Sequence, residues 1–134
     1  MDAASLPLEF GLSITPNWQR REEVDRLAQV ADQAGLELVG IQDHPYQWRF
    51  FETWTLIAYL AGTTSRVRFF PDVASLPLRP PAMLAKAAAS LDVLSGSRVE
   101  LALGRALSGT PSPPWEAPEE RRGRRWRRSR RPST

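Results

Sequence analysis

Short apolar segments alternate with longer segments of helical periodicity over about the first hundred residues. Apolar residues cluster over five to seven positions in four places, which predicts β-strands at residues 8–14, 37–41, 66–70 and 98–103. Apolar residues at helical spacing between them predict helices at residues 21–34, 51–61 and 82–94. Polar, glycine and proline residues separate these elements. The predicted order is therefore β-α-β-α-β-α-β with short connections.

The first of these helices has the clearest pattern. Val24, Leu27 and Ala31 repeat at helical spacing, and acidic residues in the first turn suit the positive end of the helix dipole. Gly35 is a natural end for the helix. The helix predicted at residues 51–61 is apolar on most sides, which indicates burial.

Strands that alternate with helices of this length indicate a parallel sheet with right-handed crossovers. Two architectures fit that order: an open doubly wound sheet and part of a (β/α)8 barrel. The first strand is not followed by the G-x-G-x-x-G pattern of a dinucleotide fold, since Gly11-Leu-Ser-Ile-Thr-Pro stands there. The prediction is an α/β fold, the N-terminal half of a (β/α)8 TIM-type barrel with four parallel strands and three helices.

The composition is that of one globular domain. The chain has 134 residues, 42% of them hydrophobic and 25% charged. It contains no cysteine, which excludes disulfides and thiolate metal sites. No window approaches a membrane span, so a cytoplasmic protein without a membrane partner is expected.

Charge divides the chain into two unlike segments. Residues 1–104 hold 9 basic and 12 acidic residues, a net charge of −3, whereas residues 105–134 hold 9 arginines and 3 glutamates, a net charge of +6. The second segment has five prolines and a single large aliphatic residue, Leu107. We therefore predict a partial barrel domain at 1–104 and a disordered Arg/Pro-rich tail at 105–134.

Two explanations of the tail are open. A shifted reading frame in GC-rich DNA encodes mostly Arg, Pro, Gly, Ala and Ser, which are the residues that dominate the tail. Back-translation of residues 107–115 into a shifted frame permits the sequence Ala-Phe-Trp-Asp-Ala-Ile-Ala-Ala-Met. The hypothesis is an out-of-frame or mis-predicted end. The rival is a real basic tail, with Trp126 among arginines, that binds nucleic acid or an anionic surface. The body has no nucleic-acid motif, so nucleic acid is not the expected partner.

The candidate chemistry lies just after the second predicted strand. Asp43 and His44, the one histidine of the chain, stand there side by side. In parallel α/β proteins ligands bind at the carboxyl ends of the strands, and a histidine can supply or remove a proton near neutral pH. The alternative is a loop histidine bonded to the backbone. One histidine with scattered carboxylates has no metal-ligand spacing, so no metal site is predicted.

Four segments carry a resemblance to a known family. They are Gln42-Asp43-His44-Pro45-Tyr46, Glu52-Thr53-Trp54, Ser75-Leu76-Pro77-Leu78-Arg79-Pro80-Pro81-Ala82, and Ala88-Ala89-Ser90-Leu91-Asp92-Val93-Leu94-Ser95-Gly96. In this order they resemble the luciferase-like family of flavin-dependent oxidoreductases, above all the branch that uses the deazaflavin coenzyme F-420.

The resemblance implies a (β/α)8 barrel that binds FMN or deazaflavin coenzyme F-420 at the carboxyl ends of its strands. It implies an acid–histidine pair, Asp43 and His44, as catalytic and coenzyme-binding residues, and Trp48 as an aromatic wall. It also places Asp72, Val73 and Ala74 at a bulge after the third strand, where the family often has a cis non-proline peptide behind the flavin ring.

The implied activity is hydride transfer to or from a small-molecule substrate. A barrel of this kind takes about 250 residues. We therefore expect this chain to bind coenzyme weakly, to be inactive as a fragment, and to associate with itself through exposed sheet edges.

Overall fold

The computed structural model describes residues 8–104, which form a three-stranded parallel sheet with helices on one face. The sheet has the order β1 (Gly11–Ile14), β2 (Leu38–Ile41), β3 (Arg68–Pro71). Pairing begins at Gly11, Leu38 and Arg68 and ends at Ile14, Ile41 and Pro71. A second parallel pair joins β4 (Ala74–Ser75) to β5 (Leu103–Gly104). The carboxyl ends of β1, β2 and β3 therefore meet at one edge.

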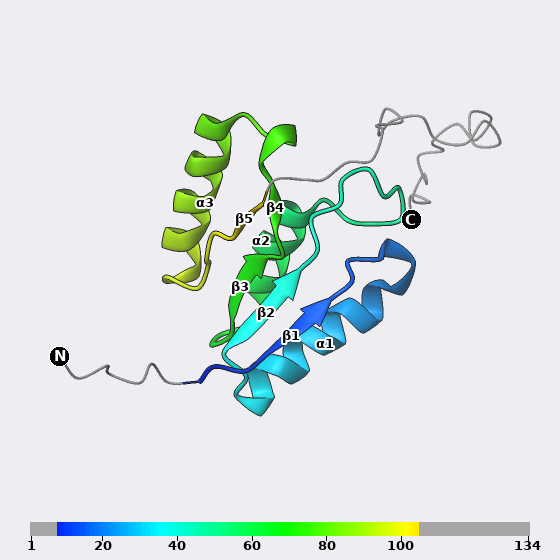
Figure 1. The fold of residues 1–134 in the computed structure, drawn as a ribbon. Helices are drawn as coiled ribbons and strands as arrows, with labels where there is room; N and C mark the ends of the chain where they lie inside the picture. Colours follow the sequence, from blue (N-terminus) through cyan, green and yellow to red (C-terminus); the bar gives the residue numbers. More distant parts are fainter. Residues whose placement is uncertain (1–7, 105–134) are drawn as a thin grey trace, which may run out of the picture.

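Helices α1 (Arg21–Ala34), α2 (Thr53–Thr63) and α3 (Pro81–Ser95) follow β1, β2 and β4. Short 3-10 turns, η1 (Trp18–Arg20) and η2 (Leu76–Leu78), precede α1 and α3. Helix α1 contacts β1 and β2, α2 contacts β3, and α3 contacts α2, so the helices lie side by side behind the sheet (Figure 1). No helix of the described residues is long and apolar enough to cross a membrane.

The core lies between the sheet and helices α1 and α2. It is made of fully or nearly buried apolar side chains, namely Ile14, Val24, Ala28, Ala31, Val39, Ile41, Leu56, Ile57, Leu60, Ala61, Val67 and Phe69. The amphipathic pattern of α1 puts Val24, Ala28 and Ala31 in this layer. The side chains of β1, β2 and β3 that point to the helices are thus removed from water.

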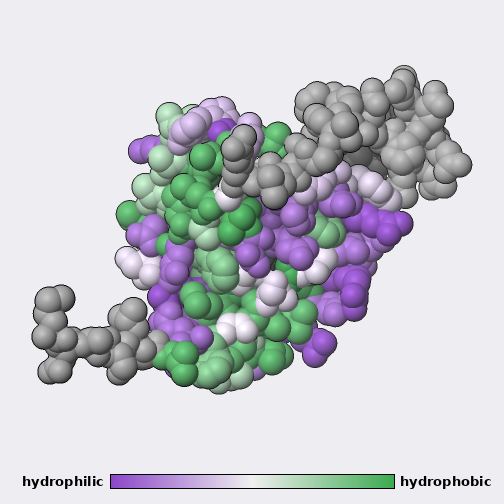
Figure 2. Space-filling model, in the orientation of Figure 1, coloured by the Kyte–Doolittle hydropathy of each residue, from purple (hydrophilic) through white to green (hydrophobic). Residues whose placement is uncertain are grey.

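The opposite face of the sheet is partly open. Gly11 and Ser13 are exposed on β1, while Ile14 is buried against the helices. On β2, Gly40 is buried under the ring of Phe70, and a Cβ at this position would lie 2.9 Å from the ring Cζ. Apolar surface is exposed in several patches on the side of the molecule seen in Figure 2.

The parallel α/β fold with three helices is as predicted, whereas the four-strand arrangement is not confirmed. The segment predicted as a fourth strand, residues 98–103, pairs with β3 only at the bridge Phe69–Val99 and is regular again at Leu103–Gly104. The ladder breaks because Pro71 has no N–H to donate and the chain bulges before Ala74. The tail predicted at 105–134 lies outside the described residues.

Candidate functional site

Asp43 follows β2 directly, and its carboxylate is buried, with 3% of the residue exposed. One carboxylate oxygen accepts a hydrogen bond from the backbone N–H of Ser75 at 2.9 Å. The other accepts from Nη2 of Arg79 at 3.4 Å. The carboxylate therefore ties the end of β2 to β4 and to the segment after η2.

Glu52 extends this cluster to the start of α2. Its carboxylate caps the helix by accepting from the backbone N–H and the hydroxyl of Thr55, each at 2.7 Å, and it also pairs with Arg79. Burial acts to raise the pKa of Glu52, but the hydrogen bonds from Thr55 and Arg79 outweigh it and lower the pKa. Burial acts to lower the pKa of Arg79, and the two carboxylates reverse this and raise it. Glu52 and Arg79 are thus held in their charged forms.

His44 lies at the surface of the same loop and is half-buried. Its Nδ1 shares a hydrogen bond of 2.7 Å with the hydroxyl of Tyr46, and the two ring centroids are 5.3 Å apart. The ring of Phe50 lies on another side, with its centroid 6.3 Å from that of the imidazole. The backbone carbonyl of His44 accepts from the N–H of Gln47 at 2.9 Å. The ring is therefore oriented by residues of its own loop.

Trp48 lies in the same loop and is 37% exposed. Its ring is 6.2 Å from that of Trp18, whose indole N–H donates to the Trp48 carbonyl at 3.2 Å. The guanidinium of Arg49 stacks over the Trp48 ring at 4.9 Å. These contacts, with the antiparallel bridge Asn17–Phe50, fasten the loop after β2 to the loop after β1. Trp54, in contrast, is a buried residue of α2 and packs in a cluster with Ala74 and Leu84.

The bulge after β3 contains Asp72, Val73 and Ala74, and the peptide bond between Asp72 and Val73 is cis. The N–H of Asp72 donates to the carbonyl of Ile41 at 2.7 Å, which places the bulge beside the end of β2. Val73 is 44% exposed, whereas Ala74 is fully buried. Val73 thus presents an apolar surface at the edge of the sheet that also carries His44.

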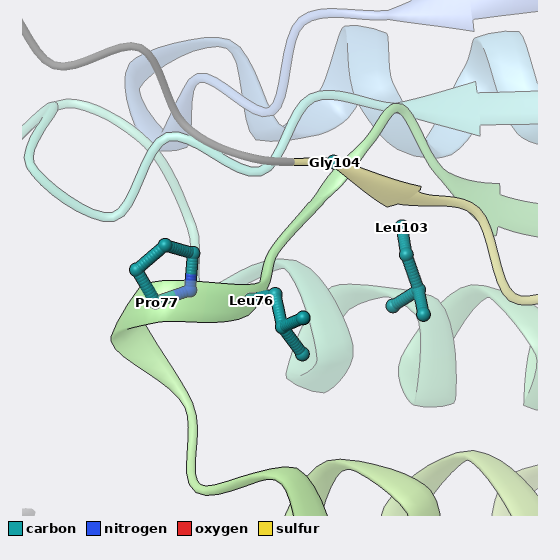
Figure 3. A pocket seen from close by; sticks show the side chains of 4 residues that line it. All are labelled: Leu76, Pro77, Leu103 and Gly104. Carbon is teal, nitrogen blue, oxygen red and sulfur yellow. The ribbon is translucent and has the colours of Figure 1, made fainter.

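A pocket of about 300 Å³ lies next to this edge, between η2 and β5. Figure 3 shows its lining residues, Leu76, Pro77, Leu103 and Gly104. Behind it, the buried hydroxyl of Ser75 and the buried indole N–H of Trp54 have no hydrogen-bond partner in the described part of the chain. The described residues contain no group of three or more His, Cys, Asp and Glu side chains that could hold a metal ion.

The structure brings together most of the residues that the sequence singles out. Asp43, His44 and the bulge at 72–74 meet at the carboxyl end of the sheet, and Trp48 lies further out in the loop. Asp43 does not contact the imidazole, because Ser75 and Arg79 occupy its carboxylate. The sequence analysis missed the roles of Tyr46, Glu52 and Arg79.

Signals for two of these roles are present in the sequence. Glu52 stands immediately before a helix, where a carboxylate serves as an N-cap. Arg79 is the one charged residue in an apolar, proline-rich stretch at 76–81. Such a residue indicates a buried partner, although the sequence does not say which one.

Comparison with known proteins agrees with this geometry. The sequence profile of the luciferase-like monooxygenases matches residues 5–130. The chain belongs to the luciferase-like monooxygenase family. The match extends beyond Gly104 and does not mark a boundary there. The division of the chain at residue 104 and the out-of-frame origin of its end therefore stay predictions.

Proteins of several bacteria have similar sequences. An uncharacterised protein of Mycobacterium tuberculosis is 51% identical over 55 residues, which are 41% of this chain and 19% of the relative. The pyrimidine monooxygenase RutA of Escherichia coli is 40% identical over 65 residues, 48% of this chain and 18% of that protein. The matched segment spans about a fifth of the length of these relatives.

Solved structures show the same fold. The coenzyme F420-dependent tetrahydromethanopterin reductase of Methanopyrus kandleri has a TM-score of 0.64 at 25% identity, covering 72% of this chain and 26% of that one. The oxygenating constituent of 3,6-diketocamphane monooxygenase from Pseudomonas putida, solved with FMN, has a TM-score of 0.66 at 26% identity, covering 76% and 30%.

Proposed function

We propose that this chain forms the N-terminal part of the coenzyme site of a flavin- or deazaflavin-dependent oxidoreductase. The observation that carries the proposal is that His44, after β2, and the bulge after β3 with its exposed Val73 both lie at the carboxyl edge of a parallel sheet. Ligands of parallel α/β folds bind at that edge. Similar solved structures are named for F420 or contain FMN, which supports the same coenzyme class.

The residues present fit the ring of such a coenzyme. Val73 offers an exposed apolar surface of the kind that packs against a flat ring, and the Trp48 ring lies further out along the same edge. A bound flavin or deazaflavin supplies the hydride chemistry. His44 would hold or move a proton at Nε2, for which the described residues provide no hydrogen-bond partner. Asp43 would act through the backbone, by holding the loop that carries His44.

We propose that the 134-residue chain by itself binds either coenzyme weakly and has little activity. The phosphate site of many barrels lies after strands seven and eight, beyond the strands described here. Exposed apolar side chains at the sheet edge, such as Leu103, support self-association.

Fluorescence titration of the purified chain with FMN and with F-420 tests this proposal. We expect weak binding of one coenzyme, reduced at least tenfold by Val73→Asp, because a carboxylate against the ring would lose hydration. Val30→Asp is the matched control, since Val30 is 48% exposed on α1 and Val73 is 44% exposed. Binding tighter than about 1 μM would overturn the weak-binding proposal. Equal effects of the two variants would overturn the placement of the ring.

A further inference from the structure

The imidazole of His44 and the phenol of Tyr46 are brought together by a tight turn. The N–H of Gln47 donates to the carbonyl of His44 at 2.9 Å, which closes a four-residue β-turn with Pro45 and Tyr46 at its centre. Proline has its φ angle fixed near the value that the second turn position requires. The turn therefore holds the Tyr46 hydroxyl 2.7 Å from Nδ1 of His44 before any ligand binds.

We infer that Tyr46 is a positioning residue that fixes the tautomer of His44. Its hydroxyl donates to Nδ1, so the proton of the neutral imidazole is carried by Nε2. The inference rests on the proposed function, in which Nε2 is the atom that exchanges a proton with the reacting groups.

The direction of the hydrogen bond follows from the chemistry of the two groups. A neutral phenol has one O–H donor, and its oxygen lone pairs are delocalised into the ring, which makes it a weak acceptor. An unprotonated imidazole nitrogen has a localised lone pair in the ring plane and is a strong acceptor. The pairing O–H to Nδ1 is therefore favoured over the pairing of an Nδ1–H with the phenol oxygen.

The other groups near His44 cannot take this role. Asp43 is its neighbour in sequence, but both oxygens of that carboxylate accept hydrogen bonds from Ser75 and Arg79 instead. Phe50 packs beside the imidazole and has no hydrogen-bonding group. Among the described residues, the Tyr46 hydroxyl is the hydrogen-bond partner of the imidazole.

The consequence for the reaction is a hydrogen-bond donor at a defined ring atom, Nε2. With Nδ1 engaged, the neutral ring carries its proton on Nε2. Without the hydroxyl the ring exchanges between two tautomers, and part of the population presents a lone pair in place of the N–H. Tyr46 thus controls what His44 offers to a ligand without touching the ligand itself.

The chain allows a clean test because it has one histidine and two tyrosines. Long-range 1H–15N spectra of ¹⁵N-histidine-labelled, coenzyme-free protein at about pH 8.5, where an ordinary imidazole is neutral, report on His44 alone. We expect a protonated Nε2 and an unprotonated Nδ1. In Tyr46→Phe the two nitrogen shifts should move toward each other. Tyr59→Phe should leave them unchanged.

The two tyrosines are well matched, since each is 43% exposed, and the Tyr59 hydroxyl donates instead to Asp25 at 3.4 Å. A wild-type spectrum with the proton on Nδ1 would overturn the inference, and so would equal spectra of the two variants. A wild-type proton on Nδ1 overturns the inference even if Tyr46→Phe fails to fold, and magic-angle spinning serves if the chain associates. A fixed tautomer in a protein that binds neither coenzyme would uphold the Tyr46–His44 pairing and contradict the proposed function.

Discussion

Replacing Arg79 by alanine should destabilise the protein far more than an ordinary surface arginine replacement. The change leaves Asp43, with only 1% of its side chain exposed, as a buried carboxylate that keeps one backbone N–H. Removal of one partner from a buried pair costs about 3–5 kcal/mol. The long 3.4 Å contact and the partial exposure of Arg79 place the cost at the low end. The Glu52 contact is solvent-exposed and adds less than about 1 kcal/mol.

The expected loss is therefore about 3 kcal/mol, a large part of the 5–15 kcal/mol of a typical domain. Urea unfolding of dilute protein, followed by tryptophan fluorescence, should show the midpoint fall by about 1.5 M at a slope of about 2 kcal/mol/M. Arg20→Ala is the control, because Arg20 pairs with Glu23 on the open surface of α1. That replacement should cost less than about 0.5 kcal/mol.

A double-mutant cycle separates the interaction energy of the ion pair from the other effects of each substitution on stability. Asp43→Asn removes the buried charge that Arg79 compensates. The double variant Asp43→Asn/Arg79→Ala should therefore lose at least about 1 kcal/mol less unfolding free energy than the two single variants lose in sum. Additive effects would show that the two side chains do not interact. A loss for Arg79→Ala no larger than that for Arg20→Ala would refute the reasoning that the Asp43 carboxylate depends on its cation.

Three further predictions concern the scaffold. Burial acts to raise the pKa of Asp32, but three backbone N–H donors of the loop before β3 outweigh it and lower the pKa. Asp32→Asn should therefore cost about 1–3 kcal/mol at neutral pH, and urea midpoints should show this loss shrink as pH falls through the lowered pKa. Gly40→Ala should lower the thermal midpoint, because its Cβ meets the Phe70 ring at 2.9 Å, whereas Gly62→Ala, with open space around it, should raise it. Leu103→Lys should shift sedimentation toward monomer by placing a charge on an exposed edge strand, and an unchanged distribution would contradict self-association there.

Sequence patterns predict the elements whose signals are local. The helix predicted at residues 21–34 has the observed bounds of α1, because its apolar stripe runs through the element and the left-handed Gly35 caps its end. The helix predicted at 51–61 begins two residues later, where Glu52 caps it. The strand predicted at 98–103 is not continuous, because its pairing depends on a bulge about thirty residues earlier in the chain.

The candidate site also combines features that local sequence patterns predict with contacts that depend on distant residues. Its place after β2 follows from the strand pattern and the Asp43–His44 pair. The partners of the carboxylate do not, since Ser75 and Arg79 lie 32 and 36 residues further along the chain. The Tyr46 contact spans two residues, yet it needs the observed turn at Pro45 to bring the rings together.

Long-range charged contacts stabilise both ends of the sheet, whereas the orientation of the candidate histidine depends on a local contact. At the amino end Asp32 binds backbone amides of a distant loop, and Arg68 pairs with Glu9 and Glu100, so these charges join segments of the scaffold. At the carboxyl end, the pairing of His44 with Tyr46 is made within one short turn. A contact closed within four residues needs little of the surrounding barrel. The orientation of the imidazole should therefore persist in this chain even where its affinity for a coenzyme is weak.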